Sequence, residues 1–225
     1  MGAAISEVLT YAIGVAISPV PIIAVILMLF TAKARVNGSM FALGWALALA
    51  VVSGVVYVAS DAASAATNST TSDTISWGQI LFGVLLLLLA ARQWRSRPEP
   101  GDDPTMPKWM AGIDTFTPAK AFGLAVLLAG VNPKNLLLSA GAAAGLAQLG
   151  LSTTDAVVSL IVFVVLGSIT IAGPVVYYLV GGDKAKVELD SMKDWLALHN
   201  AAVMTVLFLV FGVNLIANGL APLTG

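Results

Sequence analysis

The feature that most constrains this chain is a series of apolar stretches, each long enough to cross a bilayer. No charged residue occurs between Val8 and Ala32 or between Ser39 and Ala59, and Lys134 is the only charge between Ala121 and Thr154. About 20 apolar residues in a helix span the roughly 30 Å hydrocarbon core. Helices also satisfy their own backbone hydrogen bonds where water is absent. The sequence therefore predicts an all-α membrane protein.

Composition and spacing predict six transmembrane helices in 225 residues that are 58% hydrophobic and 10% charged. We expect a first three-helix repeat over 1–97, a cytoplasmic linker facing the membrane over 98–120, and a second repeat over 121–225. Asn37-Gly38 is interpreted as a turn, and 60–76 as a polar loop rich in Ser and Thr. After Gly181-Gly182, apolar residues alternate with charges, which predicts a short amphipathic helix in the interface near 183–197. The expected helices are about 8–32, 39–59, 77–91, 121–149, 156–180 and 200–220.

Two of these helices contain proline motifs and are expected to be broken. Ser18-Pro19-Val20-Pro21 interrupts the first, and Asn132-Pro133 interrupts the fourth. Proline lacks an amide hydrogen and disfavours helix at the residue before it. Pro21 precedes Gly38 by as many residues as Asn135 precedes Ser152. Because each half holds an odd number of helices, the halves are predicted to form two inverted three-helix repeats, the arrangement in which paired breaks mark a transporter binding site.

Lys134 is the leading candidate for chemistry because a lysine at bilayer depth costs roughly 2.5–3.5 kcal/mol on insertion scales. It lies beside the start of a new half-helix, whose unpaired amides and positive dipole end favour anions. Asn132 and Asn135 could hydrogen-bond a headgroup. With Pro133, these residues are predicted to form half of a substrate site. The alternative is that Lys134 reaches toward an interface while Asn132 only caps a helix.

The first break would form the other half of that site. Ser18 has the only polar side chain there, so Pro19 and Pro21 would contribute by exposing backbone carbonyls and amides. A simple proline kink, tolerated when neighbours satisfy the freed groups, explains this half equally well.

The basic residues predict the orientation through the positive-inside rule. Starting with the N-terminus outside, ten of the eleven Lys and Arg residues fall in inside loops, and Lys134 is the remaining one. Both termini are therefore expected on the outer side of the membrane. The inside residues are Lys33, Arg35, Arg92, Arg95, Arg97, Lys108, Lys120, Lys184, Lys186 and Lys193.

The composition also excludes several classes of protein. With no cysteine and one histidine, the chain has no thiolate or multi-histidine metal site, and no cofactor is expected. The near-balanced charge gives no basic face for nucleic acid. Because no acidic residue lies within a predicted helix core, proton coupling would depend on Lys134 or His199. No recognisable catalytic spacing links the candidate acids to His199, so an enzyme is not expected.

Five segments of the chain form a recognisable pattern: Ala16–Leu29, Pro107–Met110, Asp114–Pro118, Val131–Leu138 and Asn200–Met204. They resemble a known family, the glycopeptidolipid-addressing and sulfolipid-addressing (GAP) proteins, related to the lysine exporter superfamily. The resemblance covers essentially the whole chain, with His199 standing where the pattern has asparagine. It implies an actinobacterial protein of the inner (plasma) membrane that takes part in exporting cell-envelope glycolipids.

Together these observations favour an alternating-access transporter that exports an anionic envelope (glyco)lipid or lipid precursor. An exporter of amino acids or other small polar solutes, and a non-transporting accessory scaffold of a lipid export machine, are the alternatives. Gly141-Ala142-Ala143-Ala144-Gly145 is a small-xxx-small pattern that permits close helix approach. It predicts packing inside the bundle, with a homodimer contact as the alternative.

Overall fold

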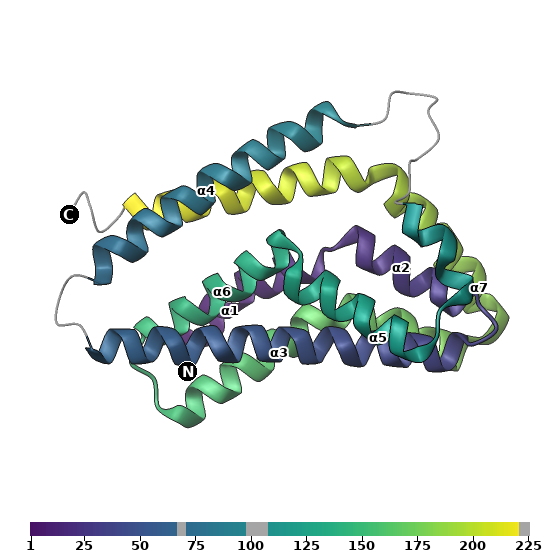
Figure 1. Cartoon of the computed structure of the whole chain (residues 1–225), viewed down its shortest axis with the longest axis horizontal. Coiled ribbons are helices and arrows are strands. Elements are labelled where there is room, and N and C mark those ends of the chain that lie inside the picture. Colours follow the sequence, from purple (N-terminus) through teal and green to yellow (C-terminus); the bar gives the residue numbers. More distant parts are fainter. Residues whose placement is uncertain (67–70, 98–107, 221–225) are drawn as a thin grey trace. The chain divides into compact units, whose positions relative to one another are not determined.

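The computed structural model describes residues 1–66, 71–97 and 108–220, and this part of the chain is helical without any strand (Figure 1). Among these described residues, the helices long and apolar enough to cross a membrane number four, or up to six if each of two bent pairs is one span. The elements are α1 (Gly2–Ala16), α2 (Pro19–Leu29), α3 (Ala34–Ala66), α4 (Thr71–Arg95), η1 (Lys108–Thr115), α5 (Pro118–Val126), η2 (Leu127–Val131), α6 (Pro133–Gln148) and α7 (Thr153–Leu220).

Both predicted breaks are confirmed. The first bent pair consists of α1 and α2, which meet at an angle of 56°, and the second consists of Pro118–Val131 and α6, which meet at 61°. Each second half begins at a proline, Pro19 or Pro133, which starts a helix readily because its missing amide hydrogen would be unpaired there anyway. The inverted-repeat relation between the two halves remains a prediction.

The chain forms two compact units. The first, called the break unit below, comprises Met1–Ser60 and Thr105–Ala197, and the second, the hairpin unit, comprises Asp61–Pro104 and Leu198–Gly225. The predicted domain boundaries at 97 and 120 follow a different principle, internal repetition, and stay predictions.

In the break unit, α1 packs antiparallel on α6 (Figure 1). A Cβ atom on Gly141 would lie 2.8 Å from a ring carbon of Tyr11, and one on Gly145 would overlap the Glu7 carboxylate. The small-xxx-small pattern therefore packs against α1 of the same chain, as predicted for the bundle interior. The homodimer alternative is not tested by this contact.

The rest of the break unit is built around large buried side chains of α3 and α7. Trp45 and Phe163 are fully buried, and the Trp45 Nε1–H donates a hydrogen bond to the Gly167 carbonyl at 3.1 Å. Segment η1 contacts α2 through a face that buries Met110 and Ile113. The buried side of this segment thus packs on the protein, and the expectation that the linker over 98–120 faces the membrane stays a prediction.

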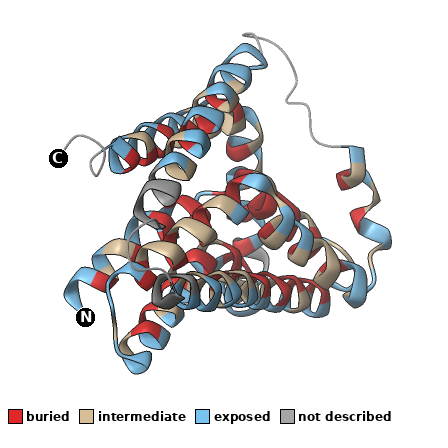
Figure 2. Ribbon diagram, turned by 60° about the vertical axis from the view of Figure 1, so that its left-hand side comes forward, coloured by how far each residue is buried: buried red, intermediate tan, exposed pale blue. Residues whose placement is uncertain are grey.

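In the hairpin unit, α4 lies along the C-terminal part of α7 (Figure 1). Gly83 and Gly212 allow the close approach, because a Cβ on Gly83 would lie 2.7 Å from the Gly212 carbonyl oxygen. Both units carry large apolar side chains on their exposed surfaces, and Figure 2 shows exposed residues along the outer sides of the helices. Apolar exposed faces of this kind fit a protein surrounded by lipid.

Three expected boundaries were wrong. Asn37-Gly38 is not a turn: it lies within α3, where Asn37 is buried and its Nδ2–H donates to the Phe116 carbonyl at 2.9 Å. The turn falls at Thr31–Lys33 instead. A tertiary contact has thus overridden the local turn preference of Asn-Gly.

The second error concerns the polar loop, because α3 continues to Ala66 and α4 begins at Thr71, which leaves only 67–70 of the expected loop outside the described residues. Ser and Thr can be accommodated in helices, and no proline or glycine interrupts either end.

The third error is the expected gap between an interfacial helix near 183–197 and a last span from about Asn200. Helix α7 kinks at Gly182, with φ 59° and ψ −137°, and then runs unbroken from Lys184 to Leu220. No glycine or proline lies between Gly182 and Gly212, so nothing local stops the helix. His199 therefore lies inside a helix and does not cap one.

Candidate functional site

The site begins where α1 ends. Helix α1 stops at Ala16, since Ser18 precedes Pro19 and adopts a non-helical conformation with φ −127° and ψ 84°. The last carbonyls of a helix have no amide partner within it and must find one elsewhere. They also lie at the negative end of the helix dipole, which favours a cation.

The second break supplies that cation. A π-helical turn, η2, ends at Val131, and α6 begins at Pro133, so Asn132 lies between them. The Asn132 Oδ1 accepts a hydrogen bond from the Lys134 amide at 3.0 Å, so Asn132 is an N-cap for α6. Capping fixes the first turn of α6 and thereby the point from which the Lys134 side chain extends.

Lys134 connects the two breaks. Its ammonium Nζ donates to the carbonyls of Gly14 and Ile17, each at 2.8 Å, and to the Ser18 hydroxyl at 2.7 Å. The side chain is buried, with 5% of the residue exposed. The three hydrogens of the ammonium thus have three partners, all of them uncharged oxygen atoms.

Ser18 and Asn135 complete the junction. The Ser18 hydroxyl donates to the Val15 carbonyl at 2.6 Å and lies 3.3 Å from the Asn135 Oδ1. The Asn135 Nδ2–H donates to the Leu128 carbonyl at 2.9 Å, and this directs its Oδ1 toward Ser18. The structure therefore brings Ser18, Lys134 and Asn135 together, although they come from opposite halves of the chain.

The other predicted site residues have different surroundings. Pro19 and Pro21 are buried in the first turn of α2, Pro133 is exposed, and Asn132 is partly buried. His199 lies in the hairpin unit and is partly buried. These positions do not test whether any of them binds a substrate.

Sequence reasoning missed Thr170. This residue of α7 donates a hydrogen bond from its hydroxyl to the Ala16 carbonyl at 2.6 Å. A third helix thus supplies a hydrogen-bond donor to a carbonyl at the end of α1. A threonine in a long apolar span is a signal, but the sequence does not say which helix it faces. A polar side chain in a membrane helix commonly bonds to a neighbouring helix.

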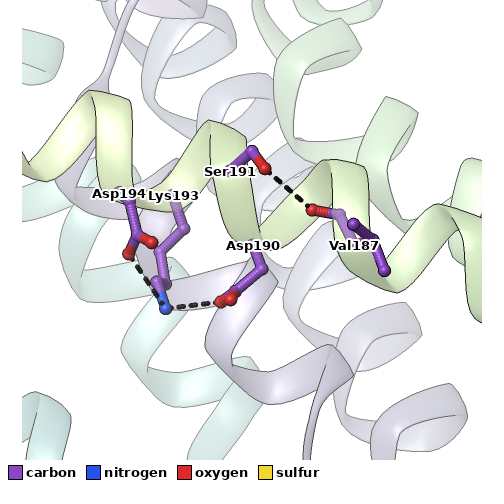
Figure 3. Close-up of polar contacts among 5 residues, drawn as sticks. All are labelled: Val187, Asp190, Ser191, Lys193 and Asp194. Atoms are coloured by element: carbon purple, nitrogen blue, oxygen red, sulfur yellow. Dashed lines mark hydrogen bonds and ion pairs between the residues drawn. The ribbon is translucent and has the colours of Figure 1, made fainter.

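A second lysine, Lys193, lies in a very different setting on α7. Its ammonium pairs with Asp190 at 2.6 Å and with Asp194 at 3.2 Å, and Figure 3 shows both contacts beside the hydrogen bond from Ser191 to the Val187 carbonyl at 3.1 Å. Near this cluster lies a surface hollow of about 340 Å³, lined by Phe30, Lys186, Val187 and Asp190.

The described residues contain no group of three or more His, Asp or Glu side chains placed to hold a metal ion.

The fold and this site define a multi-pass, all-helical membrane protein in which a buried lysine joins two bent helix pairs. A comparison with known protein families matches residues 8–221 to the family described as Sap, sulfolipid-1-addressing protein. The chain belongs to this family, in agreement with the resemblance seen in its motifs. No curated protein and no solved structure matches the chain. The relation to the lysine exporter superfamily stays a prediction.

Proposed function

We propose that this protein exports an anionic cell-envelope (glyco)lipid or lipid precursor across the bacterial inner membrane by alternating access around the two breaks. Membership of a sulfolipid-addressing family supports a lipid-related membrane function. Its partners would be membrane lipids and the anionic substrate, and its chemistry would be binding without catalysis.

The observation that carries the proposal is the setting of Lys134. Its ammonium is buried and its bonded partners are neutral, so the site keeps a positive charge that no acid in contact with it cancels. A sulfate or phosphate headgroup is a stronger partner for an ammonium than a carbonyl, because the attraction between opposite charges adds to the hydrogen bond and is larger in a buried site than in water.

An exchange of partners would link substrate binding to a change of conformation. In this structure Lys134 holds the end of α1 to the start of α6. A headgroup that drew the ammonium away would release this connection between the two broken spans. Ligands shift a two-state protein only through such differences in contact between the states.

The orientation is part of the proposal, with both termini outside and export directed from the basic side of the protein. It is supported by the distribution of Lys and Arg alone.

Export by Lys134→Ala and Lys193→Ala variants tests this function. Cells lacking the wild-type gene would carry each variant and be labelled with radioactive sulfate and phosphate. The labelled lipid at the cell surface would be measured against the amount of inserted protein. We expect Lys134→Ala to lose export at least about 10-fold, because a buried charge in contact with a substrate stabilises it by more than about 1.4 kcal/mol. Lys193→Ala should export normally.

Normal export by Lys134→Ala at normal insertion would make the break purely structural and overturn the proposal. If Lys134→Ala released less amino acid while its surface lipid was unchanged, the small-solute exporter would be favoured instead. Surface lipid that depends on the presence of the protein but on neither lysine would favour the accessory scaffold.

A further inference from the structure

The oxygen atoms around the Lys134 ammonium form a cage that has the composition of a cation site. Two are backbone carbonyl oxygens, of Gly14 and Ile17, and the third is the Ser18 hydroxyl. All three lie within 2.8 Å of one point, the position of Nζ. The Asn135 Oδ1 lies beside them, 3.3 Å from the Ser18 oxygen.

Such groups bind small monovalent cations in membrane proteins. Carbonyl oxygens replace the hydration shell of an ion in selectivity filters, and the C-terminal ends of broken helices coordinate coupling ions in transporters. The cage lies at the C-terminal end of α1, where the helix dipole adds negative potential.

The carbonyls at the end of α1 divide into two groups. Those of Val15 and Ala16 accept hydrogen bonds from the hydroxyls of Ser18 and Thr170, so they do not depend on Lys134. The carbonyls of Gly14 and Ile17 instead accept hydrogen bonds from the ammonium. If the ammonium left, these two carbonyls and the Ser18 hydroxyl would converge on a point that had lost its donor.

We propose that this cage is a binding site for a small monovalent cation, which the Lys134 ammonium occupies in the present state. When Lys134 moves to an anionic substrate, a free cation takes its place between Gly14, Ile17 and Ser18. This exchange of Lys134 for a free cation rests on the proposed function, whereas the cation site itself does not. The site would couple export to a cation without a carboxylate among the three ligands of the cage.

Thermal unfolding of the purified full chain in detergent tests the cage without any substrate. The melting temperature Tm would be measured at equal ionic strength in the chlorides of sodium, potassium, ethylammonium and the bulky cation N-methyl-D-glucamine. For Lys134→Ala, we expect at least one of the three small cations to raise Tm by at least about 2 °C over the bulky one. For the wild type, Tm should not differ between the four salts, and the same should hold for Lys193→Ala.

Two further variants identify the cage as the source of the effect. Adding Ser18→Ala to Lys134→Ala removes one ligand and should reduce or abolish the cation dependence. Lys134→Cys, the only cysteine in its chain, can be alkylated with 2-bromoethylamine to restore a side chain close to lysine. The Tm of Lys134→Cys should depend on the cation before alkylation and should no longer depend on it afterwards.

An equal Tm of Lys134→Ala in all four salts would overturn the inference, whatever the export assay shows. If that variant cannot be purified folded, Lys134→Cys decides in its place. Recovery of folded protein only with a small cation or after alkylation would support the cage, and recovery that is the same in every salt would refute it. A cation-independent Tm combined with lost export would leave the proposed function standing without this site.

Discussion

Two lysines of the break unit hold their charge in opposite ways. Lys134 is bonded to neutral atoms of the backbone and one hydroxyl, at the meeting point of two broken spans. Lys193 is bonded to two carboxylates, Asp190 and Asp194, on its own helix (Figure 3). The partners of Lys193 are fixed by helical spacing, whereas those of Lys134 exist only because α1 stops short. The hydrogen bonds of Lys134 should therefore change whenever the end of α1 changes its conformation.

The largest expected difference is in stability after either lysine is removed. Lys134→Ala leaves the carbonyls of Gly14 and Ile17 without their donor. Each buried unpaired group costs about 1–3 kcal/mol, so we expect a loss of about 2–6 kcal/mol. Lys193→Ala breaks exposed ion pairs, which contribute about 0–1 kcal/mol. Thermal unfolding of both variants in N-methyl-D-glucamine chloride measures the difference.

Equal destabilisation of the two variants would show that the hydrogen bonds at the break contribute no more than surface ion pairs. The folded fraction of each variant, from size-exclusion chromatography in the same detergent, provides the control for aggregation.

A smaller effect is expected from the packing that brings Lys134 to α1. In Gly141→Ala the new methyl would lie 2.8 Å from the Tyr11 ring, so the two helices must separate slightly. Overpacking of this kind costs about 1–3 kcal/mol. Gly123→Ala on α5 is the matched control, because its Cβ would meet nothing within 4 Å and alanine favours helix by about 1 kcal/mol.

The same variant sharpens the comparison between the lysines. Separation of α1 from α6 should lengthen the bonds of Lys134 while leaving those of Lys193 unchanged. In Gly141→Ala, removal of Lys134 should therefore cost less than it does in the wild-type background. A cost that is the same in both backgrounds would mean that Gly141 does not position the lysine.

The sequence predicted the part of this fold that follows from local chemistry. Apolar length located the spans, and the prolines located both breaks, because Pro19 and Pro133 restrict the residues around them whatever else surrounds them. The turn at Asn37-Gly38 failed for the opposite reason. A bond to Phe116, remote in the sequence, keeps Asn37 in a helix.

Three residues of the candidate site were predicted from the sequence, but their hydrogen-bond partners were not, and whether these residues bind a substrate stays a prediction. Ser18, Lys134 and Asn135 were named, and the structure brings them together. The sequence pointed to the N-terminus of α6 as the place where Lys134 acts, whereas its ammonium reaches the C-terminus of α1. No periodicity reports which carbonyl a long side chain will reach, and for the same reason Thr170 was not identified.

The smallest effect is expected at His199, the other residue considered for coupling. It lies within α7 and is partly buried, and the family resemblance places asparagine at this position. Histidine is the side chain that ordinarily changes charge near neutral pH, so a coupling role would give export a pH dependence that asparagine cannot reproduce. We expect no coupling role, so His199→Asn should have the same pH profile of export as the wild type and should export as well. Its free energy of unfolding should change by less than about 1 kcal/mol. The measurement is labelled surface lipid between pH 5.5 and pH 8, at matched amounts of inserted protein. A flattened pH profile of export in His199→Asn would assign proton coupling to His199. Lys134 would then have a role in substrate binding only.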